Sequence, residues 1–166
     1  MIEFRPMRED DLPQLHAWLQ REHVRRWWRD SRTYEETVAH YLPSIRRDEP
    51  TDHYVIALDG REVGMIETYL VSDHPAREAI VQQGEGVAGV DLLLGEEDVV
   101  GRGVGPEALR AFAREVVFAR PGVHALVAAV DDENRRSWRA FEKAGFVHAG
   151  DIEEEARPHR LMRLER

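Results

Sequence analysis

The chain has 166 residues and no cysteine, and its 23 Lys and Arg residues against 32 Asp and Glu residues give a net charge of −9. The length fits one domain that needs no disulfides, and the absence of cysteine excludes a catalytic thiol and thiolate metal sites while suiting a reducing cytoplasm. The acidic balance argues against general nucleic-acid binding and favours a cationic small substrate, although such charge can also serve solubility alone.

The first third of the chain predicts one strand and two helices. Residues 2–5 alternate apolar and polar, as a short strand does, and lack the segments of a signal peptide. The acids and proline of residues 10–13 are typical of a first helical turn. Apolar residues at helical spacing follow: Leu12, Leu15, Trp18 and Leu19. A second helix is predicted over 33–46, and the basic, aromatic residues 22–29 are left without an assignment.

The middle of the chain predicts three strands and a loop. Two β-rich segments, 53–58 and 62–71, flank an Asp-Gly pair, which is a strong hairpin signal. Residues 72–84 show no clear period and predict a long, functional loop. A third strand is predicted over 85–94, where two glycines indicate a bulge or a close backbone approach.

The last third of the chain shows clearer helix and strand patterns. The expected elements are a helix over 107–118, a strand over 124–130, a helix over 135–144 and strands over 146–152 and 158–164. We therefore expect a single domain over 1–166 of mixed α/β type. Its central sheet would be mostly antiparallel, with about six or seven strands and about four helices, and parallel crossovers only around the two later helices. No apolar run reaches 18 residues, so no membrane helix is expected.

Asp91 stands out because it lies inside an apolar strand segment. A buried, ionised and unpaired carboxylate would cost several kcal/mol, about 2 or more, so such residues are either satisfied structural groups or site residues. As a site residue, Asp91 would accept a proton from an ammonium group or anchor that cation.

The glycine-rich turn 101–105 lies between a strand and a helix. Glycines let a backbone approach a ligand closely, and a helix N-terminus favours an anion, to which Arg102 adds a charge. The spacing matches neither a P-loop nor a dinucleotide fingerprint, and the turn alone is equally compatible with no ligand. Asn134, before the next helix, is likewise explained by helix capping alone.

Taken together, this turn, Asn134 and the later segment 142–146 (Glu-Lys-Ala-Gly-Phe) resemble the GNAT superfamily of acyl-coenzyme A N-acyltransferases. The resemblance covers most of the chain. It implies that acetyl-coenzyme A is the co-substrate and that backbone amides of the turn bind its pyrophosphate. The residues expected at coenzyme A are Leu92, Leu93, Leu94, Val100, Gly101, Arg102, Gly103, Val104, Gly105, Pro106, Asn134, Phe141 and Lys143.

The first half resembles the aminoglycoside 6'-N-acetyltransferases, through the segments 23–28, 41–44, 54–57, 64–69 and 89–91. In that family the Asp of the Gly-x-Asp strand handles the amine, which here is Asp91; siderophore-type relatives tend to carry His there. The residues expected around a cationic acceptor are Trp27, Trp28, Tyr54, Tyr69, Glu85, Asp91, Asp131, Asp132, Glu153, Glu154 and Glu155. For several of these acids, a helix cap or a solvated turn is an equally good interpretation.

Three positions depart from the family pattern. Val100 occupies the usual Gln or Arg place of the turn, and Ala129 the place of an Asp before the capped helix. Phe141 replaces the Tyr that many members use as general acid, so a water, another Tyr or unassisted departure of the thiolate would have to serve.

We therefore expect a cytoplasmic acetyltransferase that acts on aminoglycosides and confers antibiotic resistance. It would have no metal, nucleic-acid or membrane partner and would be a monomer or homodimer. Two alternatives stay open. One is acetylation of another amine, such as a siderophore amine, a polyamine or a protein N-terminus; the other is a non-catalytic acyl-coenzyme A binding module, which Phe141 would permit.

Overall fold

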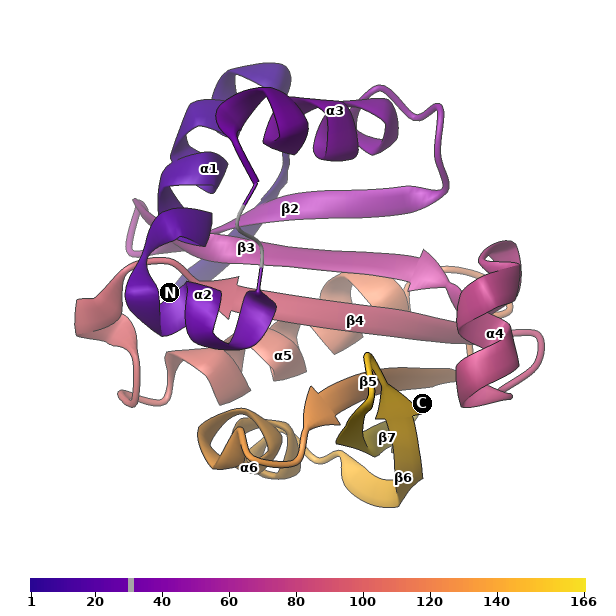
Figure 1. Cartoon of the computed structure of the whole chain (residues 1–166). Helices are drawn as coiled ribbons and strands as arrows, with labels where there is room; N and C mark the ends of the chain where they lie inside the picture. The colour runs from indigo at the N-terminus through magenta and orange to yellow at the C-terminus, as the bar shows by residue number, and fades with distance from the viewer. Residues whose placement is uncertain (30–31) are drawn as a thin grey trace. The chain divides into compact units, whose positions relative to one another are not determined.

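The computed structural model describes residues 1–29 and 32–166 (Figure 1). The strands are β1 Ile2–Pro6, β2 Thr51–Leu58, β3 Arg61–Leu70, β4 Val87–Leu94, β5 Ala125–Asp131, β6 Val147–Glu154 and β7 Arg157–Glu165. The α-helices in the described residues are α1 Leu12–Gln20, α2 Glu22–Trp28, α3 Tyr34–Ile45, α4 Pro75–Val81, α5 Val104–Phe112 and α6 Arg135–Lys143. The strand order β1-β2-β3-β4-β5-β7-β6 makes one seven-stranded sheet, which confirms the predicted fold class.

The contacts divide the chain into two compact units, which we describe separately. Unit 1 comprises residues 1–67 and 91–102, and unit 2 comprises residues 68–90 and 103–166. The three boundaries fall inside β3, inside β4 and within the glycine-rich turn 101–105, so the candidate site residues are distributed over both units. No helix in the described part of the chain is long and apolar enough to cross a membrane.

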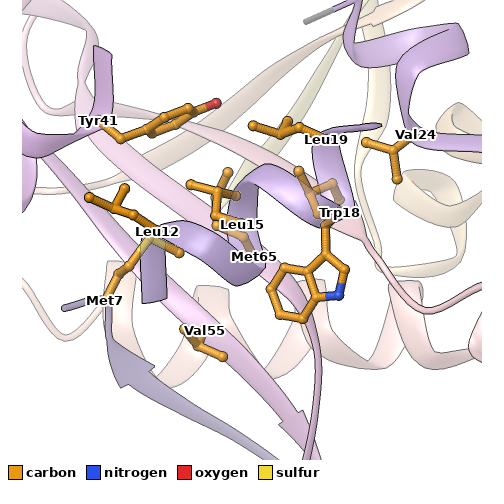
Figure 2. Close-up of a cluster of buried hydrophobic side chains, with 10 residues drawn as sticks. Met7, Leu12, Leu15, Trp18, Leu19, Val24, Tyr41, Val55 and Met65 are labelled. Atoms are coloured by element: carbon orange, nitrogen blue, oxygen red, sulfur yellow. The ribbon is translucent and has the colours of Figure 1, made fainter. Parts of the chain in front are cut away.

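Unit 1 is built around one face of α1 (Figure 2). The four apolar residues predicted to share a helical face are all buried: Leu12, Leu15, Trp18 and Leu19. They pack with Tyr41 of α3 and with strand residues that include Val55, Met65 and Leu93. Burying each such side chain stabilises the fold by about 1.5–3 kcal/mol, so this helix face accounts for much of the stability of unit 1.

The N-terminus of α3 lies where the sequence predicts it. Thr33 Oγ1 accepts a hydrogen bond from the Glu36 amide at 3.2 Å, and the Glu36 carboxylate accepts one from the Thr33 amide at 2.8 Å. This capping box satisfies two backbone donors that a helix start leaves without partners. The unassigned segment before it forms α2, a seven-residue helix that buries only Val24.

In unit 2, β4 and β5 are parallel, as expected for strands joined through a helix. The crossover through α6 has a different outcome, because β6 does not pair with β5. Instead β7 lies between them and pairs antiparallel with both. The expectation of parallel pairing therefore holds for the first crossover only.

Two further predictions need correction. The segment 72–84 is not a long loop, since a short 3-10 turn and α4 occupy most of it. The helix expected over 107–118 begins at Val104, three residues earlier, and continues from Ala113 to Val117 as a π-helix. A close approach at a β4 glycine is confirmed: a Cβ on Gly89 would lie 2.3 Å from the Tyr69 ring.

Candidate active site

Asp91 lies on β4 in unit 1 and is half-buried. Side chains two residues apart on a strand share a face, so Asp91 points to the same side of the sheet as Leu93, which is packed in the unit 1 cluster. The carboxylate thus sits next to the hydrophobic core and still reaches solvent. This position is compatible with a group that meets a polar ligand at the edge of a core.

The end of β4 is fixed by a side chain of α2 and by one of the residue that joins α1 to α2. The Leu94 carbonyl contacts His23 Nε2 of α2 at 2.9 Å, and Arg21 Nη1 donates to the Gly95 carbonyl at 2.8 Å. Leu94 is one of the backbone groups expected to pair with coenzyme A, and its carbonyl is already engaged by His23. Sequence reasoning assigned no contact to His23, which lies in the basic, aromatic segment 22–29 that shows no recognised period.

Glu96 anchors this end of the strand. Its carboxylate accepts hydrogen bonds from Arg21 Nη1 and from the indole Nε1 of the buried Trp18, both at 2.9 Å. Arg61 adds a third contact at 3.1 Å. The hydrogen bonds from Arg21 and then Trp18 hold the pKa of Glu96 below its ordinary value, and burial opposes them only in part. The network ties α1 to the segment that leads into the glycine-rich turn.

The paired tryptophans lie on α2. Trp28 packs against the unit 1 cluster, and Trp27 is half-buried with the Arg26 guanidinium 5.0 Å from its ring centroid. The two rings therefore have different surroundings, and Trp28 is the one that contributes to the core of unit 1. Tyr54 lies on β2 and is also half-buried.

The glycine-rich turn crosses the boundary between the units. Val100 and Arg102 end unit 1, and both Gly101 and Gly103 have positive φ angles, 80° and 86°. In unit 2, Val104, Gly105 and Pro106 form the first turn of α5, where backbone amides have no partner within the helix. Pro106 lacks an amide hydrogen and so leaves none unsatisfied there. The exposed 101–103 backbone and this helix start fit an anionic ligand.

The second predicted coenzyme A segment lies on α6 of unit 2. Asn134 is the N-cap of this helix, and its Oδ1 accepts a hydrogen bond from the Ser137 amide at 3.2 Å. Phe141 is buried and packs edge-to-face against Phe146, with ring centroids 5.0 Å apart. Lys143 is exposed in the last turn, where its carbonyl accepts a hydrogen bond from Arg110. Each of these residues thus has a structural role in unit 2.

The predicted acceptor acids of unit 2 are largely paired with arginines. Asp131 Oδ2 lies 3.1 Å from Arg157 Nε, and Asp132 Oδ1 lies 2.6 Å from Arg160 Nε. Glu154 forms an ion pair with a further arginine, Arg77 of α4. These partners balance the carboxylate charges, so the contacts favour a structural role for the three acids over binding of a cationic substrate.

The remaining predicted residues of unit 2 have different surroundings. Glu85, Glu153 and Glu155 are exposed, and Glu155 lies in the turn between β6 and β7 with a φ of 51°. Tyr69 is half-buried on β3 and contacts the His74 ring at a centroid distance of 4.9 Å. Among the described residues, no group of three or more His, Cys, Asp or Glu side chains is placed to hold a metal ion.

Unit 1 also holds a polar cluster that sequence reasoning missed. His53 of β2 lies between Ser44 of α3 and Glu67 of β3, with Nε2 2.7 Å from Ser44 Oγ and Nδ1 2.9 Å from Glu67 Oε2. The His53 side chain is 5% exposed and that of Glu67 is 16% exposed. Glu67 lies between the apolar run 63–66 and Thr68 of β3, so its sequence context gave a weaker signal than that of Asp91.

Comparison with known proteins identifies the fold. Residues 7–154 match the family model described as an acetyltransferase (GNAT) domain. The chain belongs to the GNAT acetyltransferase family. The predicted resemblance is therefore confirmed, and the match runs through both units.

The chain is also similar to aminoglycoside acetyltransferases. It is 31% identical over 154 residues to aminoglycoside N(6')-acetyltransferase type 1 of Klebsiella pneumoniae, which covers 91% of this chain and 76% of the relative. A crystal structure of the aminoglycoside acetyltransferase AAC(6')-Ib with coenzyme A superposes with a TM-score of 0.91 and 30% identity, covering 100% of this chain and 95% of the other. A second, with coenzyme A and kanamycin, gives a TM-score of 0.90 at the same identity and coverage.

Proposed function

We propose that this GNAT acetyltransferase transfers the acetyl group of acetyl-coenzyme A to the 6'-amine of aminoglycoside antibiotics. The observation that carries the proposal is 31% identity to an aminoglycoside N(6')-acetyltransferase across 91% of the chain. The similar AAC(6')-Ib structure with coenzyme A and kanamycin supports both substrates. A family match that spans residues 7–154 further supports one acyltransferase domain.

The proposed reaction is a direct transfer between two bound substrates. The ammonium group of the acceptor first loses a proton to Asp91, directly or through a water. The neutral nitrogen then bonds to the thioester carbonyl carbon, the carbon–sulfur bond breaks, and the coenzyme A thiolate leaves with the electron pair. The acylated nitrogen loses its extra proton to solvent or to the thiolate, which leaves a neutral amide. Holding both substrates together makes the step effectively unimolecular.

The exposed glycine backbone and the first turn of α5 supply donors that suit the pyrophosphate of coenzyme A. Phe141 has no hydroxyl and is buried against Phe146, so it donates no proton to the leaving thiolate. That proton comes from solvent or the thiolate departs unprotonated. Within unit 1 we assign the role of base or amine anchor to Asp91, and Trp27, half-buried on α2 of the same unit, is the aromatic residue that we assign to the acceptor.

The proposal also implies where in the cell the enzyme acts and what it does there. An enzyme that uses acetyl-coenzyme A on antibiotics would act in the cytoplasm and protect the cell against them. The net charge of −9 suits a polycationic acceptor and disfavours nucleic acid.

The decisive experiment measures thiol release from acetyl-coenzyme A with kanamycin, tobramycin and a panel of other amines, together with mass spectrometry of the product. Acetylation at the 6'-position is the expected result. Transfer only to a siderophore amine, a polyamine or a peptide N-terminus would replace the substrate assignment. Tight coenzyme A binding without any transfer would instead indicate a binding module.

The role of Asp91 is tested by Asp91→Asn. Loss of a general base lowers kcat by about 100-fold or more, whereas the acetyl-coenzyme A KM should change little. Asp10→Asn is the matched control, because Asp10 is exposed in the same unit and removes the same charge. An unchanged kcat in Asp91→Asn would remove Asp91 from the mechanism.

A further inference from the structure

An open cavity of about 400 Å³ lies at the end of α5, and all of its lining residues belong to unit 2. Arginines and apolar residues line it: Arg110, Arg114 and Arg166 with Ala113, Phe118, Ala144 and Leu164. None of these residues takes part in the proposed acetyl transfer. The volume falls within the range of roughly 300–1,000 Å³ that is typical of small-molecule sites.

The cavity carries positive charge that the protein balances only in part. Arg110 Nη1 donates to the Lys143 carbonyl at 2.6 Å, which fixes the guanidinium without neutralising it. Arg114 pairs with Glu115 at 2.6 Å, but the two side chains are 74% and 51% exposed, so water screens this pair and it holds Arg114 only weakly. In the described part of the chain, no other carboxylate pairs with any of the three cavity arginines. A bound anion would therefore meet charge that is still to be neutralised.

The third arginine of the cavity differs from the arginines before it on β7. Arg157, Arg160 and Arg163 each form an ion pair with an Asp or a Glu, as expected of arginines that stabilise the fold. Arg166 follows the same strand, and its amide donates to the His124 carbonyl at 2.9 Å, which holds the strand end next to the start of β5. The side chain of Arg166 lines the cavity instead of pairing with an acid of the described residues.

A π-helical turn builds the apolar side of the cavity. Ala113–Val117 is a π-helix, and the Phe118 amide donates to the Ala113 carbonyl, five residues back, at 2.8 Å. In a regular α-helix, residues five apart lie about 140° apart around the axis, so Phe118 would point away from Ala113. Hydrogen bonds that span five residues bring the two close to alignment, and both line the cavity. Because π-turns are rare and frequently occur at functional sites, this turn is a second indication of a ligand.

The cavity lies at the opposite end of α5 from the residues that we assign to coenzyme A. Val104 begins α5, and Arg114 follows ten residues later, which corresponds to about 15 Å along the helix axis. In the same way, Asn134 caps the start of α6, whereas Ala144 follows its end. A ligand in the cavity therefore leaves the proposed cofactor residues of unit 2 uncovered.

The lining indicates the chemical class of the ligand. A guanidinium donates parallel hydrogen bonds to two oxygens of a carboxylate or a phosphate, and the apolar residues accommodate a hydrophobic group. The cavity suits a small molecule better than a protein, since stable protein interfaces bury about 1,200 Å² or more. We propose that the cavity is a second ligand site, which binds a small organic anion through the three arginines while its apolar ring packs on Phe118 and Leu164. The inference goes beyond acetyl transfer and does not depend on it.

Calorimetry of the full chain tests the site with phenyl phosphate and benzoate, which carry the two anionic groups on the same ring. At least one of them should bind roughly tenfold or more tightly than benzyl alcohol, the uncharged analogue, and than inorganic phosphate, which has no ring. The tighter of the two identifies the anionic group. Saturating coenzyme A should change the affinity by less than about twofold. No binding of either anion, equal binding of benzyl alcohol or inorganic phosphate, or displacement by coenzyme A would each overturn the site.

Variants place the ligand in the cavity. Arg114→Gln should weaken the binding of the tighter anion roughly tenfold or more, because it removes a charge-assisted hydrogen bond. Arg136→Gln removes the same charge from an exposed position on α6 outside the cavity, and it should change the affinity by less than about twofold. An equal loss in both variants would mean general attraction of anions and would overturn the site.

Two-dimensional NMR locates the ligand independently of stability. On addition of the tighter anion, amide shifts of residues 110–118 and 164–166 should change most in the wild type and far less in Arg114→Gln. Shift changes centred on the glycine-rich turn 101–105 would place the anion at the proposed cofactor residues and overturn the inference. Neither readout requires acetyl transfer, so a failure of the proposed function would leave this test intact.

Discussion

Gly64→Ala should push β3 away from β4 at the C-terminal end of β4, next to Leu93 and Leu94. The new Cβ would lie 2.2 Å from the Leu93 carbonyl oxygen and 3.1 Å from the Leu94 Cα, both of them backbone atoms. Such contacts are not found below 3.0 Å, so the two backbones must move apart by at least 0.8 Å. That movement would stretch the neighbouring hydrogen bond from the Gly95 amide to the Val63 carbonyl, now 2.8 Å, beyond bonding distance.

The cost combines overpacking, about 1–3 kcal/mol, with one weakened ladder hydrogen bond of about 1 kcal/mol. A gain of about 0.5 kcal/mol from the stiffer unfolded chain offsets part of it. We expect the free energy of unfolding to fall by about 1.5–3.5 kcal/mol and Tm by roughly 3–14 °C, measured by guanidinium titration and calorimetry.

Gly150→Ala is the matched control for this substitution. Gly150 also lies on a strand, its φ is not positive, and a Cβ there meets nothing within 4 Å. Its free energy of unfolding should stay within about 0.5 kcal/mol of the wild type. If Gly64→Ala were as mild as the control, the close approach of β3 and β4 would be refuted.

Two further predictions concern charged groups. The hydrogen bond from Arg21 holds the pKa of Glu96 below its ordinary value of 4.5, so the ionised carboxylate stabilises the fold above that pH, and this contribution is lost as the pH falls through the folded pKa. Glu96→Gln should therefore be less stable than the wild type at pH 7. Urea titrations at pH 7 and pH 3.5 should show that the difference in free energy of unfolding shrinks at the lower pH. Arg157→Gln removes one partner of the buried Asp131 and should cost about 1–3 kcal/mol in the same assay, and no loss would mean that the other groups around it, such as the Glu133 amide, satisfy this carboxylate.

Sequence reasoning succeeded where local pattern decides the structure. The apolar face of α1 and the capping residue Thr33 follow from spacing and side-chain chemistry within a few residues. It failed for α4, a seven-residue helix that buries only Val81 and whose Arg77 pairs with Glu154 far along the chain. A helix this short depends on tertiary contacts that no local period reveals.

The sequence was enough to single out some candidate site residues, but not the side chains that contact them. Asp91 and the glycine-rich turn were found because an acid in an apolar strand and a cluster of glycines are unusual locally. The arginines that balance Asp131 and Asp132 lie on β7, more than 20 residues further along, and only the strand pairing brings them together. His53 was missed for the same reason, since Ser44 and Glu67 come from two other elements.

The position of β7 between β5 and β6 has a consequence for synthesis on the ribosome. β6 leaves the exit tunnel before β7, yet β7 is the strand with which β6 pairs, and β5 also awaits β7 on one side. Until β7 emerges, the nascent chain carries an unpaired strand edge, which is the kind of surface that promotes aggregation.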